Sequence, residues 1–108
     1  MEDGMPPKHN PTHPGEFIFD VYLEPNGVKG RELAQNLDVA SSTLSRILKG
    51  TSRVIPEVAL RLSKALGRTP ESWLAMQEAY DLRQARKHVN LRRVKPIKWE
   101  TDAKSVTN

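Results

Sequence analysis

A nine-residue stretch, 41–49, places six polar side chains on one side of a predicted helix. The sequence there reads SSTLSRILK, and its apolar residues Leu44, Ile47 and Leu48 recur at helical spacing on the other side. The polar side carries only hydroxyl groups and cations: Ser41, Ser42, Thr43, Ser45, Arg46 and Lys49. Short hydroxyls reach base edges or phosphates, and an arginine can donate two hydrogen bonds to guanine O6 and N7. The pattern favours DNA recognition over an ordinary solvated helix face, and Arg53 in the following loop adds a candidate phosphate contact.

The residues just before this stretch supply the element that would hold it. Residues 31–37 predict a short helix, and Asp38 follows at the turn, where the chain often takes the left-handed conformation that Asp tolerates better than most residues. Ala34 is small enough to let a second helix cross closely. Two short helices with a tight turn between them have the dimensions of a helix-turn-helix motif, with 41–49 as the recognition helix.

Apolar periodicity and helix-start signals predict an all-α fold of five helices. The first helix begins at Pro14, ends before Pro25 and turns Phe17, Ile18, Val21 and Tyr22 inward. Two further helices follow the motif. One begins at Pro56 and ends before Gly67, and the other runs from Pro70 to about Lys87. The predicted organisation is an extended arm over 1–13, a helix-turn-helix domain over 14–87, and a basic C-terminal tail or short strand over 88–108.

Length and composition narrow the class of protein. The chain has 108 residues, enough for one domain, with 37% apolar and 28% charged residues. It has no cysteine, which excludes disulfides and thiolate metal sites and fits the cytosol. No signal peptide is visible, and no apolar run approaches the length of a membrane span. We therefore expect a cytoplasmic protein with no membrane partner.

Charge is distributed unevenly along the chain. Residues 1–28 carry five acids and one base, a net charge of −4, whereas residues 83–99 carry seven bases and no acid. The basic segment either attracts polyanions or is simply a solvated tail. In the acidic part, Glu16, Asp20 and Glu24 stand four residues apart and form one helical stripe. The stripe is either a docking face for a basic partner or a solvated helix face.

The sequence gives little support for an active site or a metal-binding site. His9 and His13 have a spacing that suits metal ligands on a helix, but Pro11 between them argues against a helix there. Ser, His and Asp all occur, yet no nucleophile elbow or metal-binding pair is present. We expect no enzyme activity, no cofactor and no metal.

Residues 9–86 resemble the HigA-type antitoxins, a branch of the XRE-like helix-turn-helix family. The entry segment His13-Pro14-Gly15-Glu16 is one specific part of this resemblance, and the pattern that runs from Trp73-Leu74 through Gln77 to Tyr80-Asp81-Leu82 is another. Further matching segments are 9–11, 23–25, 32–34, 43–48, Gly50, 56–57, 59–62 and 69–74. The resemblance implies a five-helix, lambda-repressor-like helix-turn-helix domain.

The resemblance also implies two activities. The protein would repress its own operon by binding double-stranded operator DNA as a homodimer, and it would neutralise a toxin similar to the RelE-type mRNA-cleaving enzymes. A stand-alone repressor of the same family without a toxin remains the alternative. For the dimer we expect the fifth helix to supply Trp73, Met76 and Tyr80, which offer more apolar surface than a small core absorbs. The acidic stripe, Glu16, Asp20 and Glu24, is the candidate toxin-binding face.

Three helix starts depart from the family pattern because they lack a capping hydroxyl. Lys29 precedes the second helix, Ala40 the recognition helix and Ile55 the fourth helix. A missing cap costs about 1 kcal/mol. The short side chains of Ser41 and Ser42 also shift the expected sequence readout toward Thr43 and Arg46.

Overall fold

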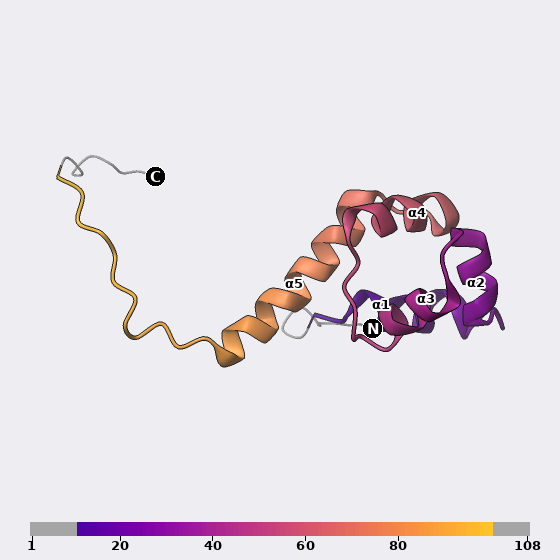
Figure 1. The fold of residues 1–108 in the computed structure, drawn as a ribbon, viewed down its shortest axis with the longest axis horizontal. Helices are drawn as coiled ribbons and strands as arrows, with labels where there is room; N and C mark the ends of the chain where they lie inside the picture. The colour runs from indigo at the N-terminus through magenta and orange to yellow at the C-terminus, as the bar shows by residue number, and fades with distance from the viewer. Residues whose placement is uncertain (1–10, 101–108) are drawn as a thin grey trace, which may run out of the picture.

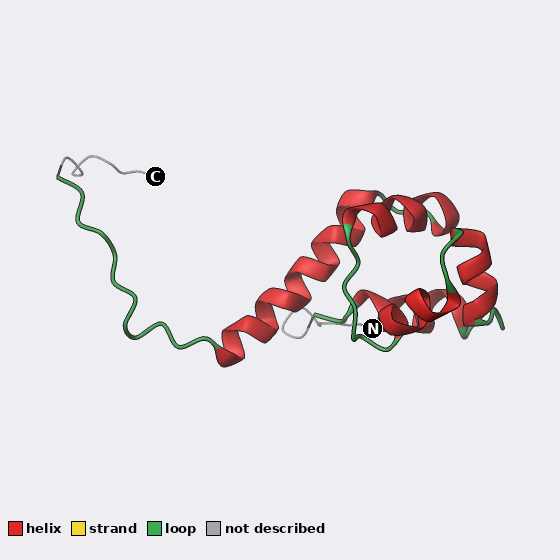
Figure 2. Ribbon diagram, viewed as in Figure 1, coloured by secondary structure: helices red, strands yellow, loops and turns green. Residues whose placement is uncertain are grey.

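The computed structural model describes residues 11–100, and within this range the chain forms helices and no strand (Figures 1 and 2). The elements are α1 (Pro14–Ile18), the π-helical segment η3 (Phe19–Leu23), α2 (Gly30–Leu37), α3 (Ser41–Leu48), α4 (Pro56–Leu66) and α5 (Pro70–His88). The predicted all-α class with five α-helices is confirmed. Most of the predicted arm, including His9, and the last eight residues of the tail lie outside the described residues.

The helices begin at the residues that the sequence marks. Proline occupies the first position of α1, α4 and α5, where its missing N–H and its fixed φ suit a helix start. Thr69 caps α5, since its hydroxyl accepts a hydrogen bond from the Ser72 N–H at 3.0 Å. No side chain caps α3 or α4, as predicted from Ala40 and Ile55. At α2 the Glu32 carboxylate accepts from the Lys29 N–H at 3.4 Å, which satisfies the N-cap residue itself, while no side chain accepts from the N–H groups of the first turn.

The first helical stretch differs from the prediction in its second half. From Phe19 the backbone widens into π-helical turns, and the Glu24 N–H donates to the Phe19 carbonyl at 2.9 Å. Each residue of the wider turn rotates the chain by less than in an α-helix, so the residue five positions on moves toward the inner face and the residue three positions on moves away from it. Ile18 and Leu23 enter the core, and Val21, which we expected inside, is 45% exposed.

The core lies where the helices of residues 14–77 meet. Its members come from every helix and from one loop residue: Ile18, Leu23, Leu33, Ala34, Leu37, Leu44, Ile47, Val54, Val58, Ala59, Leu62 and Trp73. The predicted inward faces of α2 and α3 are confirmed in full except for Leu48, which is half-buried. On α4, Ala65 is exposed although the periodicity placed it inside.

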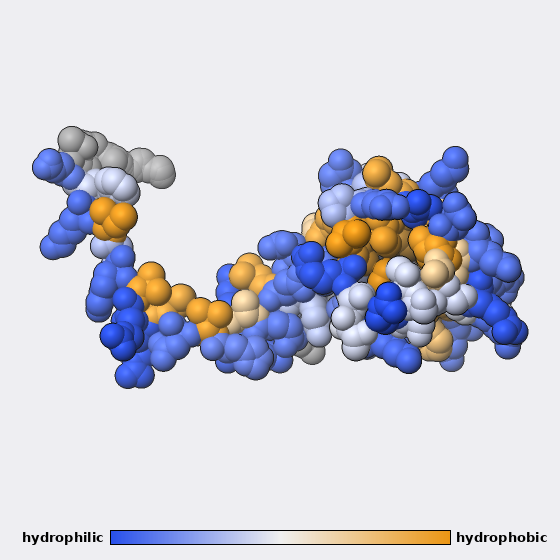
Figure 3. All heavy atoms as spheres, viewed as in Figure 1, coloured by the Kyte–Doolittle hydropathy of each residue, from blue (hydrophilic) through white to orange (hydrophobic). Residues whose placement is uncertain are grey.

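The C-terminal half of α5 and the residues beyond it project away from this core (Figure 1). The Cα radius of gyration is 18.5 Å, whereas a compact domain of 108 residues has about 13 Å. Residues 89–99 run extended with one turn, in which the Val94 N–H donates to the Leu91 carbonyl at 3.0 Å. The described part of the tail therefore contains no strand. Apolar and hydrophilic side chains alternate along it, as Figure 3 shows.

Candidate nucleic-acid interface

Helices α2 and α3 form the helix-turn-helix motif, and the turn between them is left-handed. Asp38 has φ 58° and ψ 47°, the αL conformation expected from the sequence. The Val39 N–H donates back to the Ala34 carbonyl at 3.0 Å, which closes the end of α2. Buried Ala34 is small at this crossing, and Leu44 of α3 packs in the same core. This geometry sets the angle at which α3 is presented.

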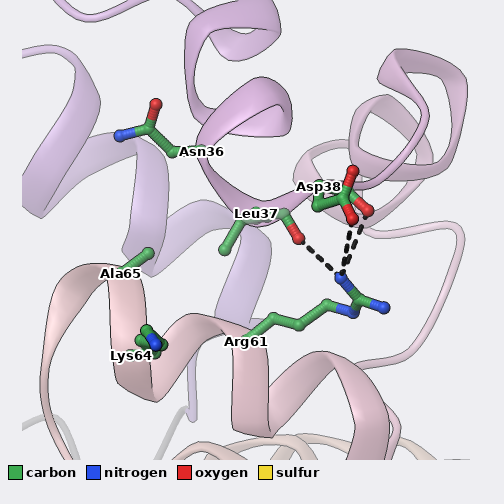
Figure 4. Close-up of a pocket in the computed structure, with 6 residues that line it drawn as sticks. All are labelled: Asn36, Leu37, Asp38, Arg61, Lys64 and Ala65. Carbon is green, nitrogen blue, oxygen red and sulfur yellow. Dashed lines mark hydrogen bonds and ion pairs between the residues drawn. The ribbon is translucent and has the colours of Figure 1, made fainter.

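Arg61 of α4 stabilises the turn from the side (Figure 4). Its Nη1 donates to the carbonyl oxygens of Leu37 at 2.9 Å and Asp38 at 3.2 Å. The Glu57 carboxylate, one turn earlier on α4, accepts from Arg61 Nη2 at 2.8 Å and fixes the guanidinium. The last carbonyls of a helix have no partner within that helix, so Arg61 acts as a C-terminal cap supplied by another element.

Helix α1 supports α3 from behind, and Gly15 makes this possible. A Cβ atom at position 15 would overlap the carbonyl oxygen of Ile47 and lie 2.8 Å from the Cα of Leu48. Only glycine leaves room for the two backbones to approach this closely. The Gly in the His-Pro-Gly-Glu segment is therefore a packing requirement of the recognition helix.

His13 connects α1, the loop after α3 and α5. Its Nδ1 accepts a hydrogen bond from the Gly15 N–H at 2.9 Å, so this side chain is the N-cap of α1. The imidazole is 5% exposed and meets the Tyr80 ring edge-on at a centroid distance of 4.9 Å. Burial lowers the pKa of His13, while a hydrogen bond with the Ser52 backbone and the negative charges of Asp81 and Glu16 oppose that shift.

The outer face of α3 carries the residues predicted to contact DNA. Ser41, Ser42, Arg46 and Lys49 are exposed, and Thr43 and Ser45 are half-buried. No acidic residue lies in α3, so the face is neutral to positive. The helix ends in a closed loop, because the Arg46 carbonyl accepts from the N–H groups of Thr51 at 2.9 Å and Ser52 at 3.2 Å. The arrangement presents hydrogen-bond donors and cations on the outer face of α3.

The loop that follows α3 is tied to α5 by a chain of four polar groups. The Val54 N–H donates to Gln77 Oε1 at 2.7 Å, and Gln77 Nε2 donates to Asp81 Oδ1 at 3.0 Å. The other oxygen of Asp81 accepts from Arg53 Nε at 2.7 Å and from Arg53 Nη2 at 2.6 Å. Arg53 is thus the terminal group of a network rather than an isolated surface cation.

Metal-binding clusters and membrane-spanning helices are both absent from residues 11–100. In this range no three His, Asp or Glu side chains gather in a way that would hold a metal ion. None of the helices described is both long and apolar enough to cross a membrane.

The sequence and the fold of this chain match those of known proteins. The helix-turn-helix family matches residues 22–74. A solved HigA-family addiction module antidote protein from Coxiella burnetii is 36% identical, with a TM-score of 0.68 over 72% of this chain and 85% of its own. The chain belongs to the HigA-type antitoxin family.

Two further relatives of this HigA-type chain differ in what their names state. The antitoxin GraA, solved in complex with its operator, is 39% identical with a TM-score of 0.67, over 82% of this chain and 85% of GraA. A protein of Escherichia coli K12 described as an uncharacterized HTH-type transcriptional regulator is 38% identical over 82% of this chain and 93% of its own length. The resemblance to HigA-type proteins expected from the sequence is confirmed.

In this HigA-type protein Trp73 does not offer the dimer surface that we expected. Its side chain is fully buried, and its indole N–H donates to the Gly67 carbonyl at 3.0 Å. The Arg68 guanidinium lies 5.5 Å from the centre of the indole ring. Tyr80 packs against His13, and Met76 is half-buried against the core. The indole ring of Trp73 lies inside the domain because Phe17 of α1 and Tyr22 of η3 pack against it.

The acidic stripe is exposed. Glu16, Asp20 and Glu24 all face solvent. Asp20 lies in the π-helical segment η3, whereas Glu16 belongs to α1 and Glu24 follows η3.

Sequence reasoning missed three residues that position the interface. His13 was considered as a metal ligand, yet its place directly before an N1 proline is a signal for a capping residue. Gln77 is a polar residue on an apolar stripe, which requires a buried hydrogen-bond partner. Nothing in the sequence indicates that Arg61 reaches the turn of the motif, because that contact spans 24 residues.

Proposed function

We propose that this protein binds operator DNA and represses its own operon, with α3 in the major groove. The observation that carries the proposal is the outer face of α3, where Ser41, Ser42, Arg46 and Lys49 are exposed on a helix fixed from behind by α1 and α2. Thr43 and Ser45 lie at its edges and Arg53 beside its end. In such interfaces an arginine commonly contacts the base edges, while the cations around it contact backbone phosphates.

DNA binding is proposed to require a homodimer, since one recognition helix makes few base contacts and such motifs read two half-sites about 34–36 Å apart. With Trp73 buried, the apolar surface available for pairing lies further along α5. Leu82 is 45% exposed and Val89 57% exposed, and both line a surface hollow with Ala85, Arg86 and Leu91. We place the dimer contact there, with Met76 and Tyr80 at most at its margin.

The second activity proposed is neutralisation of a toxin of the RelE-like, mRNA-cleaving kind. Family membership supports a toxin partner, and the exposed carboxylates of Glu16, Asp20 and Glu24 suit a basic protein that itself binds RNA. The alternative is a stand-alone repressor, which the similarity to an uncharacterized regulator favours. Purification of the protein from its native cells separates the two, because only the antitoxin brings a small basic protein with it.

The DNA proposal is tested with two neighbouring cations and two DNA fragments. One fragment is the region upstream of the protein's own gene, and the other is a scrambled fragment of equal length. Arg46→Ala is expected to cost about 1–3 kcal/mol on the upstream fragment and to reduce the preference over the scrambled one. Lys49→Ala is expected to weaken both alike and to lower the slope of log K against log salt by about 0.9 per lost contact. Equal losses on both fragments for Arg46→Ala would make it a phosphate contact instead.

The toxin proposal is tested by separating the two activities. Changing Ser42, Thr43 and Arg46 to Ala is expected to abolish binding to the upstream fragment while growth rescue from the toxin persists. Reversing Glu16, Asp20 and Glu24 to Lys is expected to do the opposite, with each desolvated charge pair worth about 1.5 kcal/mol or more. If the triple Lys variant rescues cells at the wild-type dose, the acidic residues do not bind the toxin.

A further inference from the structure

The contact between Arg53 and Asp81 joins the loop after the recognition helix to a helix 28 residues away in sequence. Both groups are partly open to solvent, with side-chain exposures of 55% for Arg53 and 32% for Asp81. An exposed ion pair adds little to folding stability. Its position beside the recognition helix suits a role in orienting a functional group instead.

The hydrogen bonds leave one end of the guanidinium free in a defined direction. Asp81 Oδ2 accepts from Nε and from Nη2, which are adjacent nitrogens on one edge of Arg53. Nη1 is the nitrogen that this carboxylate oxygen does not engage. The guanidinium is planar and rigid, so fixing one edge also fixes the direction of the remaining donors.

The backbone on both sides of Arg53 is also held by hydrogen bonds. The next residue, Val54, is fully buried, and its N–H donates to Gln77 Oε1. Gln77 is 1% exposed and also donates to Asp81 Oδ1, so the residue that anchors the loop orients the carboxylate as well. On the other side, Ser52 is held by the Arg46 carbonyl of α3 itself. Arg53 therefore stands in a fixed relation to the recognition helix.

We propose that Asp81 is a positioning residue for DNA binding, which holds the Arg53 guanidinium by one edge so that Nη1 donates to a backbone phosphate beside the α3 groove. The inference rests on the proposed DNA-binding function. It assigns to α5 a part in the DNA interface that its place in the sequence does not suggest. Gln77 acts one step behind, by orienting Asp81.

Whether neutralising Asp81 strengthens or weakens DNA binding distinguishes two possible roles for its carboxylate. Arg53 and Asp81 together have no net charge, so a carboxylate near DNA lowers affinity unless the geometry it imposes outweighs its repulsion from phosphate. If Asp81 merely competed with phosphate for Arg53, its neutralisation would tighten binding. If it positions Arg53, neutralisation weakens binding although the protein gains one positive charge.

The test is a mutant cycle of wild type, R53A, D81N and the R53A/D81N double variant. The amide side chain of the D81N protein retains an oxygen that accepts from Gln77, while its nitrogen cannot accept from Arg53, so D81N breaks the outer link alone. Affinities for the upstream fragment are measured at several salt concentrations by fluorescence anisotropy. Thermal unfolding followed by circular dichroism checks that all four proteins fold alike.

We expect R53A and D81N each to weaken binding about 3- to 10-fold and to lower the salt slope by about 0.9 per lost phosphate contact. D81N is expected to have no further effect in the R53A background, because Asp81 acts through Arg53. Arg53→Lys keeps the charge without the planar edge, so it is expected to bind more weakly than wild type and to be insensitive to D81N. A D81N protein that binds as tightly as wild type or more tightly overturns the proposal. So does an equal D81N loss in both backgrounds.

R46A on the same two fragments separates this inference from the proposed function. If wild type prefers the upstream fragment and R46A loses that preference while D81N has no effect, only the role of Asp81 is wrong. If wild type binds the two fragments equally and R46A changes neither, the proposed function fails and the role of Asp81 fails with it.

Discussion

At the scale of single residues, the position of α3 depends on groups outside its proposed DNA-binding face. Gly15 permits the contact between α1 and α3, and His13 caps α1 while it packs against Tyr80. Both residues belong to the His-Pro-Gly-Glu segment. The segment therefore connects α1 to α3 and α5, and the contributions of Gly15 and His13 can be tested separately.

Gly15→Ala is expected to destabilise the protein by about 1–3 kcal/mol or more, because the added Cβ overlaps the Ile47 carbonyl and forces α1 away from α3. Urea unfolding followed by circular dichroism measures the loss. Gly30→Ala is the matched control, since its Cβ would meet only the Leu48 side chain at 3.4 Å. Equal stability of the two variants would contradict the close packing of α1 on α3.

Protonation of His13 is expected to destabilise the fold in mild acid. Its pKa in the folded protein lies below the ordinary value of 6.5, so the unfolded chain binds this proton more readily. Stability is full above pH 6.5 and falls as the pH drops from there toward the lowered pKa, by at most about 1.4 kcal/mol per pH unit. Urea unfolding between pH 8 and pH 5 measures this.

The control for that experiment is His13→Asn, which keeps a side-chain acceptor for the N-cap but does not titrate. Its free energy of unfolding is expected to fall less between pH 7 and pH 5 than that of the wild type. Parallel pH profiles for the two proteins would assign the acid sensitivity to other groups.

At the scale of elements, the helix-turn-helix motif is held together by a helix outside it. Arg61 of α4 donates to the two carbonyls at the turn, and Glu57 of the same helix fixes its guanidinium. The short α2 has no hydroxyl cap at its start, so the closure of its C-terminal end matters for its stability. The motif is thus a part of the domain rather than an autonomous unit.

Arg61→Met is expected to cost about 1 kcal/mol of stability, since the side chain is 34% exposed and water partly replaces the lost donors. Hydrogen exchange at Asp38 and Val39 is expected to accelerate more than the global loss explains, because the turn itself is released. Lys64→Met on the same helix, also beside the hollow in Figure 4, is the control and is expected to be nearly neutral. Unchanged exchange at the turn in Arg61→Met would refute the capping role.

At the scale of the whole molecule, α5 has two parts with different environments. Its first half supplies Trp73 and Gln77 to the core, whereas Leu82 and Val89 in and beyond its second half are exposed. Apolar side chains continue along the tail, with Leu91, Val94, Ile97 and Trp99 all at least 65% exposed. A lone chain leaves this surface open to water, which is the reason to place the dimer contact here.

Changing both Leu82 and Val89 to Asp is expected to convert a dimer into a monomer in sedimentation velocity at micromolar concentration. The domain is expected to stay folded because neither side chain belongs to the core. Leu60→Asp is the control, since Leu60 is 61% exposed on α4, away from this surface. A double variant that remains dimeric would place the contact elsewhere, and a monomeric wild type with full affinity for the upstream fragment would refute the need for a dimer.

The sequence by itself determined the local features of this protein. Proline at the first helical position, the αL residue Asp38 and the periodicity of α2 and α3 act through neighbours within a few residues, so they can be read directly. The same locality explains why the outward residues of α3 were predicted together. The family resemblance could also be recognised from the sequence, because its motifs are short segments that follow one another in a fixed order.

Only the tertiary structure decided how distant segments share their side chains. The π-helical turns exchange Val21 for Leu23 in the core, and the interior takes up Trp73, which we had assigned to a dimer surface. Arg53, expected as a free phosphate contact, is joined to Asp81 across 28 residues. Burial and long-range hydrogen bonding depend on which surfaces meet in space, and the periodicity of a single helix does not contain that information.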